Sequence, residues 1–232
     1  MKPRPSNRRN QAMTLTEVLV TVFVLAVLAA TILPVTNGSR RKAVAMRIAC
    51  VNNLKQIVLA HKLWPGDQSD KYPMQVSVTN GGVMELVISG NVAADFLAMS
   101  NEISDPKLLI CPADSSRIVA TNFSTDLSNS KISYFASLDA AEEYPQRFLC
   151  GDDNFAIGGI PVKSGLLEIS TNAPIAWTAA RHVNQGNIGL TDGSVSQTDD
   201  QLLVQKLIET GVATNRLALP WNRAVQIKAA MR

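Results

Sequence analysis

The sequence contains few of the residues from which catalytic or metal-binding sites are built. Its 232 residues include three cysteines, two histidines and only 5% aromatic residues. Three cysteines are too few for a disulfide scaffold, and they lack the close pairs expected of a zinc site. The sequence also has no Gly-x-Ser-x-Gly elbow, no His-Glu-x-x-His pair and no glycine-rich phosphate loop. We therefore predict no catalytic residues, no metal ligands and no enzyme activity.

The chain also lacks a basic surface suited to nucleic acid. Its formal net charge is +3, but four of its 22 basic residues lie within the first ten positions, where there is no acid. The other 18 basic residues face 19 acidic ones. A near-neutral body has no basic stripe to follow phosphates, so nucleic acid is not a predicted partner. At this length we expect one domain with extra helix.

A long uncharged segment lies near the N-terminus. No charged side chain occurs from Val18 to Ser39, and residues 18–35 are nearly all apolar. A helix of this length crosses most of a bilayer core, so we predict a membrane-spanning segment. In a secretory signal peptide the cleavage site follows the apolar region, whereas here the best small residue, Ala12, precedes it. Glu17 lies at the edge of the segment. Placing its carboxylate in hydrocarbon costs free energy, so its presence there calls for a specific explanation.

The residues around Ala12 read Ala-Met-Thr-Leu-Thr-Glu, and they resemble the cleavage and methylation motif of type IV prepilins and type II secretion pseudopilins. The resemblance implies that prepilin peptidase cuts between Ala12 and Met13, and that Met13 is then N-methylated. It also implies a filament-assembly role for Glu17, the fifth residue of the mature chain. Leu15 is the third, and Pro34 is the twenty-second, where many relatives carry a helix-kinking proline. Ala12 and Met13 replace the usual Gly and Phe as tolerated variants.

A second resemblance lies further along the chain. Nine residues separate His182 from Asp192-Gly193, which is similar to the H-X9-DG signature of a bacterial branch of prepilin-type proteins. The segments 52–56 (NNLKQ) and 111–114 (CPAD) also resemble that branch. By their own chemistry, Asp192 and Gly193 predict a two-residue hairpin turn, because both tolerate positive φ. We therefore predict a structural role for His182, Asp192 and Gly193 rather than an acid–base pair.

These observations predict a pilin-like α+β fold, in which a long N-terminal helix packs on an antiparallel β-sheet with short helices. We expect a leader at 1–12, a transmembrane and assembly helix at 13–35, an amphipathic continuation at 36–64 and a globular domain at 65–232. Pro34 and Asn37-Gly38 should bend or loosen the helix between its halves. Helical spacing predicts the residues that pack on the domain: Val44, Ile48, Val51, Leu54 and Val58.

Within the domain, alternation and turn residues predict short elements. Helical spacing over 84–100 is broken by Gly90, and a further helix opens at Thr198-Asp199 and closes at Gly211. Strands are expected at 72–79, 108–110, 132–138, 147–150 and 166–169.

The cysteines and one run of acids leave alternatives. Export would place the cysteines in an oxidising space, so we predict a bridge between Cys50 and Cys111, with Cys111 and Cys150 as the competing pair. Residues 152–154 (Asp-Asp-Asn) offer oxygens to calcium, and the major pseudopilins that the chain resembles bind calcium in a domain loop. No full series of ligands at alternating positions is present. We interpret these residues as solvated loop acids and expect no cofactor, with calcium as the alternative.

The resemblance implies a structural subunit of a type IV pilus-like or type II secretion pseudopilus-like filament. The alternative is a membrane-tethered extracytoplasmic binding module that uses the prepilin leader without forming a filament. The implied partners are prepilin peptidase, other pilin or pseudopilin subunits and the inner membrane. The chain would cross this membrane once, with its domain outside the cytoplasm and later on the filament or cell surface.

Overall fold

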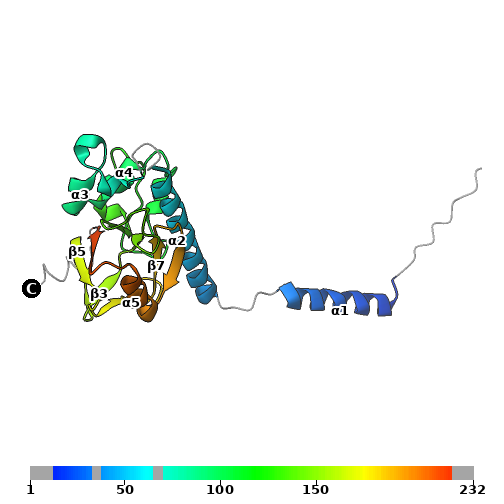
Figure 1. Ribbon diagram of the computed structural model, residues 1–232. Helices are drawn as coiled ribbons and strands as arrows, with labels where there is room; N and C mark the ends of the chain where they lie inside the picture. Colours follow the sequence, from blue (N-terminus) through cyan, green and yellow to red (C-terminus); the bar gives the residue numbers. More distant parts are fainter. Residues whose placement is uncertain (1–12, 33–37, 65–69, 221–232) are drawn as a thin grey trace, which may run out of the picture. The chain divides into compact units, whose positions relative to one another are not determined.

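The computed structural model describes residues 13–32, 38–64 and 70–220, which carry colour in Figure 1. Ala12 and Pro34 therefore lie outside the described residues. The chain divides into two compact units, one ending at Arg40 and the other beginning at Arg41. An apolar N-terminal helix is followed by antiparallel sheets and short helices, so the predicted α+β class is confirmed.

Helix α1 (Leu15–Ile32) contains neither glycine nor proline, and apolar residues fill most of its positions. Its first turn is closed by a reciprocal pair of hydrogen bonds. The Glu17 N–H donates to Thr14 Oγ1 (3.3 Å), and the Thr14 N–H donates to the Glu17 carboxylate (3.0 Å). This capping box satisfies two backbone donors that the start of a helix otherwise leaves unpaired. Beyond Glu17 the helix has no charged face, so it needs an apolar environment around it.

Helix α2 (Gly38–Leu63) packs on the domain through its C-terminal half. The predicted packing stripe is right for Leu54 and Val58 and wrong for Val44 and Ile48, which are 50% and 57% exposed. The buried face is rotated from that stripe and takes in Ile57 and Ala60 as well as His61, whose ring is polar. Its buried members are Cys50, Leu54, Ile57, Val58, Ala60 and His61.

Two antiparallel sheets form the centre of the domain. The strands predicted at 132–138, 147–150 and 166–169 are confirmed as β1, β2 and β5. Within the described residues, the larger sheet has the order β5-β9-β1-β2-β7-β8 and the smaller one β4-β3-β6. Their bounds are β1 (Tyr134–Ser137), β2 (Phe148–Asp152), β3 (Phe155–Ile157), β4 (Ile160–Pro161), β5 (Gly165–Ser170), β6 (Ile175–Trp177), β7 (Gly186–Leu190), β8 (Val195–Thr198) and β9 (Thr214–Leu219).

Short helices cover the sheets. Helices α3 (Met84–Ile88) and α4 (Val92–Ala98) confirm the helical pair predicted around Gly90, and α5 (Asp200–Glu209) begins at its predicted cap. The strands predicted at 72–79 and 108–110 are wrong, because these segments form 3-10 turns. Proline at the start of two of these turns fixes φ and cannot donate to a strand ladder. The turns are η2 (Pro73–Gln75), η3 (Val78–Asn80) and η4 (Pro106–Leu109), and a further 3-10 turn, η5 (Asn129–Lys131), lies outside these segments.

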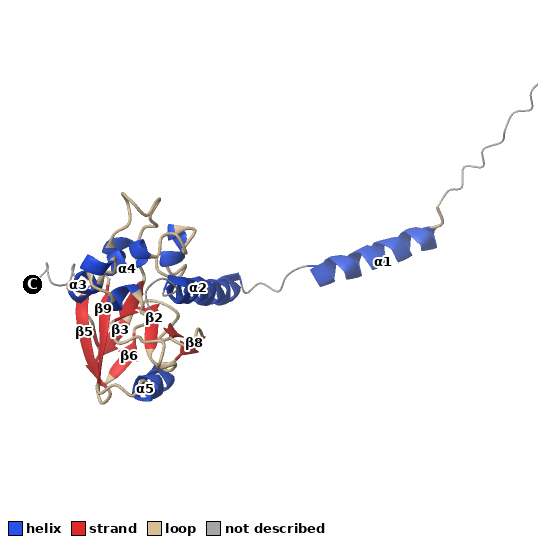
Figure 2. Ribbon diagram, turned by 45° about the horizontal axis from the view of Figure 1, so that its top comes forward, coloured by secondary structure: helices blue, strands red, loops and turns tan. Residues whose placement is uncertain are grey.

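The larger sheet is buried on both faces. Along β1, Tyr134 and Ala136 belong to the core beneath α2, α3 and α4, whereas Phe135 belongs to the core on the α5 side. This alternation follows from the two-residue period of a strand. Figure 2 shows α3 and α4 on one side of the strands and α5 on the other. Gly189 allows α2 to approach, since a Cβ there would lie 2.4 Å from Val58 Cγ2.

Candidate functional site

The predicted processing and assembly residues lie at the start of α1. Ala12 is outside the described residues, and the side chains of Met13 and Leu15 are 63% and 82% exposed. The Glu17 carboxylate accepts hydrogen bonds from the N–H and the hydroxyl of Thr14, at 3.0 and 3.1 Å. This capping role was not predicted from the sequence, although Thr-x-x-Glu before an apolar run is its ordinary signature.

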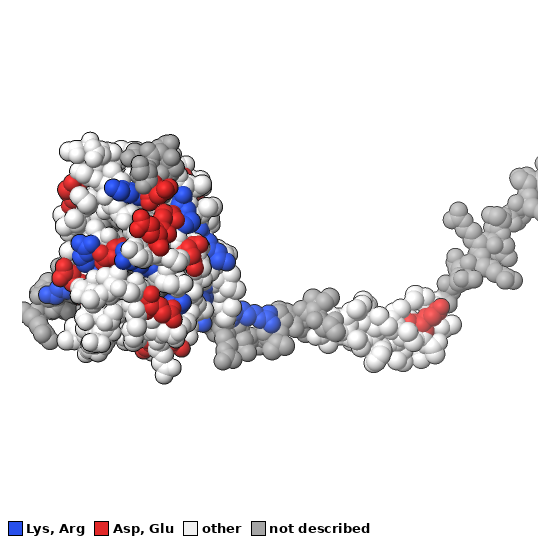
Figure 3. All heavy atoms as spheres, viewed as in Figure 1, with Lys and Arg blue, Asp and Glu red and all other residues white. Residues whose placement is uncertain are grey.

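The rest of α1 is an apolar surface. The helix has 18 residues, which at 1.5 Å per residue is about 27 Å, close to the hydrocarbon thickness of about 30 Å. Its large apolar side chains, among them Leu19, Phe23 and Leu25, are exposed. Figure 3 shows the helix without Lys or Arg and with acidic atoms near one end. A membrane covers such a surface, and these residues anchor the N-terminus of the chain there.

Among the described residues, the segment of α2 from Arg41 to Leu63 is long and apolar enough to cross a membrane, whereas Leu15–Ala30 of α1 is a shorter apolar helix. Composition alone does not separate a membrane span from the core helix of a domain, but burial does. Cys50, Leu54 and Ile57 are completely buried against the domain. A helix that supplies one side of a protein core cannot also be surrounded by lipid, so we assign the membrane segment to α1.

Four side chains that are far apart in the sequence meet beneath α2. Cys50 lies on α2, Cys111 follows η4, Asp152 ends β2, and His182 lies in the turn before β7. One ligand atom of each lies within 4.8 Å of the other three, and all four residues are buried. We call this group the Cys-Asp-His cluster.

The contacts within the Cys-Asp-His cluster are short. The Cys111 Sγ lies 3.1 Å from His182 Nε2, and the Cys50 Sγ donates to Asp152 Oδ1 at 3.4 Å. The second carboxylate oxygen of Asp152 lies 3.8 Å from the same His182 nitrogen. Hydrogen bonds from Cys50 and His182 lower the pKa of Cys111 to about 6, whereas burial raises the pKa of Cys50. Thiols, imidazole and carboxylate thus converge on one point.

The structure brings together the first of the two predicted cysteine pairs. Cys50 and Cys111 are both in the cluster, with their sulfur atoms no more than 4.8 Å apart. All three cysteines belong to the described residues, and each is a free thiol. Cys150 is buried on β2 outside the cluster. Disulfide pairing therefore stays a prediction.

The backbone that carries His182 is strained. His182, Val183 and Asn184 have φ values of 51°, 55° and 55°, a left-handed region that is a genuine outlier for a β-branched residue. Each such residue costs on the order of 1–3 kcal/mol, and surrounding contacts must hold it. Arg47 of α2 supplies one such contact, because its Nη2 donates to the His182 carbonyl at 3.0 Å.

The acids predicted to be solvated in the 152–154 segment are buried, so that prediction was wrong. Asp153 lies between two arginines: Arg117 Nη2 donates to one carboxylate oxygen at 2.5 Å, and Arg181 Nη2 donates to the other. Burial is tolerated because each charge has a partner. These partners occupy the oxygens of Asp153, and the arrangement gives no support to calcium there.

The Asp192-Gly193 pair turns a hairpin, as predicted, but the loop is one residue longer. The Leu190 N–H donates to the Ser194 carbonyl at 2.9 Å, and Gly193 has a φ of 93°. The exposed Asp192 carboxylate accepts from the Ser194 N–H at 2.8 Å. His182 instead belongs to the buried Cys-Asp-His cluster, so the structure does not pair it with Asp192 as an acid and a base.

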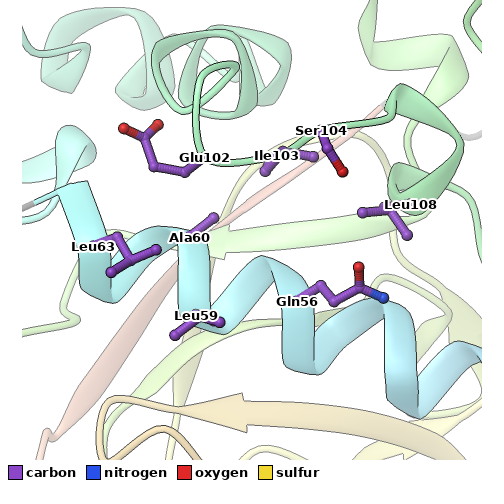
Figure 4. Close-up of a pocket in the computed structure, with 8 residues that line it drawn as sticks. All are labelled: Gln56, Leu59, Ala60, Leu63, Glu102, Ile103, Ser104 and Leu108. Carbon is purple, nitrogen blue, oxygen red and sulfur yellow. The ribbon is translucent and has the colours of Figure 1, made fainter.

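A small hollow lies between α2 and the segment 102–108 (Figure 4). Its volume is about 110 Å³, against about 300–1,000 Å³ for ordinary ligand pockets. This size gives no support to a small-molecule site. Its lining residues are Gln56, Leu59, Ala60, Leu63, Glu102, Ile103, Ser104 and Leu108.

Comparison with known proteins bears on the N-terminal segment. Residues 7–33 match the family described as the prokaryotic N-terminal methylation motif, which is the prepilin-type signal of type IV pilins and pseudopilins. The match takes in Ala12, Met13, Glu17 and all of α1, and it makes the chain pilin-like or pseudopilin-like. No curated protein and no solved structure matches the chain significantly. The H-X9-DG resemblance stays a prediction.

Proposed function

We propose that this chain, which carries a prepilin-type signal at residues 7–33, is a structural subunit of a pilus-like or pseudopilus-like filament. Prepilin peptidase cuts between Ala12 and Met13, and Met13 is N-methylated. Helix α1 first holds the precursor in the inner membrane and then packs against the α1 helices of neighbouring subunits. One observation carries the proposal: α1 is an exposed apolar helix that lies within the prepilin-type signal.

Membrane residence and filament packing cover the same surface of α1. In the precursor, lipid surrounds its exposed apolar side chains; in the filament, neighbouring helices do. Lipid tails and apolar side chains are equally apolar, so this exchange provides little hydrophobic driving force and no preferred register. Directional contacts must therefore select how far one α1 is shifted along another.

Glu17 is the residue of α1 best suited to that selection. In the single chain its carboxylate is held by the N–H and hydroxyl of Thr14. Cleavage would create an ammonium group on Met13, and the ammonium of a neighbouring subunit would neutralise a charge that is costly in apolar surroundings. A neighbour out of register would leave both groups unpaired, so the pair favours one axial stagger.

Helix α2 offers a second contact surface. Val44 and Ile48 are one helical turn apart, share a face, and are 50% and 57% exposed. The domain of the same chain leaves this face uncovered. In the filament we expect a neighbouring subunit to cover it.

Sheared surface filaments test the assembly role. We expect Glu17→Leu to be inserted and cleaved but absent from filaments, and Glu17→Asp to be recovered at reduced yield because its shorter arm strains the contact. Thr14→Ala removes the capping hydroxyl but keeps the carboxylate, so it should still assemble. Glu143→Leu makes the same chemical change as Glu17→Leu at an exposed site of the domain and should assemble like the wild type.

Two outcomes would contradict this role. Recovery of Glu17→Leu at wild-type yield would show that no pairing is needed. Equal loss of Glu17→Leu and Thr14→Ala would show that Glu17 acts only as a helix cap. A wild-type chain that is cleaved but never recovered in filaments would instead support the membrane-tethered binding module.

A further inference from the structure

We propose that Cys50, Cys111, Asp152 and His182 bind one zinc ion in a closed structural site beneath α2. This inference goes beyond filament assembly and does not depend on it. Two thiolates, one imidazole and one carboxylate are all established zinc donors, and four protein ligands are typical of a structural rather than a catalytic site.

The separations between the donor atoms fit a tetrahedral ion. Zinc bond lengths of about 2.0–2.3 Å place neighbouring ligand atoms about 3.3–3.8 Å apart in a tetrahedron. The cluster has 3.1 Å from Cys111 Sγ to His182 Nε2 and 3.4 Å from Cys50 Sγ to Asp152 Oδ1. All four ligand atoms lie within 4.8 Å of one another, so modest side-chain shifts complete the geometry.

The direction of these contacts favours a metal over catalysis. In a nucleophile–histidine–aspartate relay, the nucleophile and the carboxylate bind opposite nitrogens of the ring. Here the Cys111 thiol and the Asp152 carboxylate both lie against Nε2 of His182. Donors that converge on one point are arranged for an ion between them. Cys111 is also completely buried, so a substrate would have no access to it.

The surrounding residues hold the ligands in place. The backbone N–H and the side-chain amide of Asn187 both donate to Asp152 Oδ2 at 2.8 Å, which leaves Oδ1 turned toward Cys50. Tyr134 Oη lies 3.4 Å from Cys50 Sγ, and Arg47 holds the His182 carbonyl. Supporting contacts of this kind fix the orientation of metal ligands and raise affinity.

The charges also favour a divalent cation. Two thiolates and one carboxylate carry three negative charges, and a zinc ion reduces the total to one. The Arg181 guanidinium, 3.6 Å from Asp152 Oδ1, stands beside that remaining charge. Buried negative charge without a cation is costly, and cysteine binds zinc as a thiolate, so zinc binding releases the protons that remain on the cluster.

The ion would join four segments that lie far apart in the sequence. Cys50 belongs to α2, and the other three ligands come from the segment after η4, the end of β2 and the strained turn before β7. Zinc would therefore lock α2 onto the domain and supply contacts that hold His182 in its left-handed conformation. A Cys50–Cys111 disulfide would remove two ligands and exclude this site.

The test uses the full-length chain in detergent micelles, purified with a reductant, stripped with a chelator and dialysed. Titration with zinc should give one bound ion per chain and a concentration-dependent rise in melting temperature. Cobalt in place of zinc should give the thiolate charge-transfer and visible bands of a tetrahedral site. Cys50→Ser, His182→Gln and Asp152→Asn should each weaken zinc binding by roughly 100-fold or more, above the loss caused by changing supporting residues.

Cys150→Ser is the matched control, because Cys150 is equally buried and lies outside the cluster. It should retain the cobalt spectrum and the zinc affinity. The inference is overturned if the folded wild-type chain binds no metal, or if a Cys50–Cys111 disulfide is recovered from protein purified without reductant in the presence of zinc. It is also overturned if Cys150→Ser loses binding to the same extent as Cys50→Ser. The wild-type spectrum alone decides the matter if a ligand variant fails to fold.

Discussion

The pairing of His61 with Asp95 provides a sharp test of how α2 packs. His61 on α2 and Asp95 on α4 are both completely buried, with Nε2 2.9 Å from Asp95 Oδ2. The other ring nitrogen lies 3.0 Å from the Ile57 carbonyl oxygen. The Ile57 carbonyl can only accept, so Nδ1 donates to it, and Nε2 forms a buried hydrogen bond with the Asp95 carboxyl group. Asp95 Oδ1 is buried with no hydrogen-bond partner among the described residues.

We expect His61→Leu to lower the free energy of unfolding by about 3–5 kcal/mol, because it leaves a buried carboxylate without its partner. For a domain of this size that corresponds to a loss of roughly 6–20 °C in melting temperature. The double variant His61→Leu/Asp95→Leu should recover most of the loss, because replacing both partners of a buried hydrogen-bonded pair by well-packed apolar residues costs little. Tyr72 and Phe96, whose rings lie about 6 Å from His61, provide the apolar surroundings.

Thermal and urea unfolding of the chain in detergent, followed by circular dichroism, measure these differences. A His61→Leu variant as stable as the wild type would refute the packing of α2 on α4. A double variant less stable than His61→Leu would show that the loss in the single variant does not come from leaving Asp95 without its partner.

Two further predictions concern the same domain. Gly189→Val should destabilise the domain by about 1–3 kcal/mol or more in urea unfolding, since even a Cβ there would lie 2.4 Å from Val58 Cγ2. The control is Gly158→Val, where no atom lies near the position of a Cβ. This control should show only the free-energy cost of a positive φ. Burial alone would raise the pKa of Asp114, but Arg181 and Arg117 lower it below its usual value. The stabilising contribution of Asp114 is therefore present above about pH 4 and is lost as the pH falls through the lowered pKa of the folded state. In metal-free protein, Asp114→Asn should flatten the acid side of the curve of stability against pH, and an unchanged slope would contradict this.

The elements that could be predicted from the sequence are those whose signal is local. The apolar run, the small residue before it and Glu17 are contiguous, so the N-terminal signal could be recognised without a structure. The cap at Asp199 and the hairpin at Asp192-Gly193 likewise depend on residues within one or two turns. In contrast, the segments beginning at Pro73 and Pro106 have strand-like composition, and the prediction gave too little weight to the proline that starts each 3-10 turn.

The Cys-Asp-His cluster could not be predicted, because its four ligands come from segments far apart in the chain. Spacing of cysteines along the sequence argued against a zinc site, and that argument holds only for sites built from adjacent ligands. The same limit applies to the 152–154 acids, whose arginine partners lie elsewhere in the sequence. His61 also lacks the apolar character that would place it on the buried face of α2, and only the fold reveals that it belongs there.

The account as a whole depends on processing of the N-terminus, because α1 can enter a filament only after the basic leader is removed. Mass spectrometry of the mature N-terminus measures this directly. We expect a chain that begins at Met13, carries one N-methyl group and lacks residues 1–12. A chain that retains Met1, or one that is cut beyond residue 30, would contradict the account, because either would leave Glu17 unable to take its place as the fifth residue of an assembling subunit.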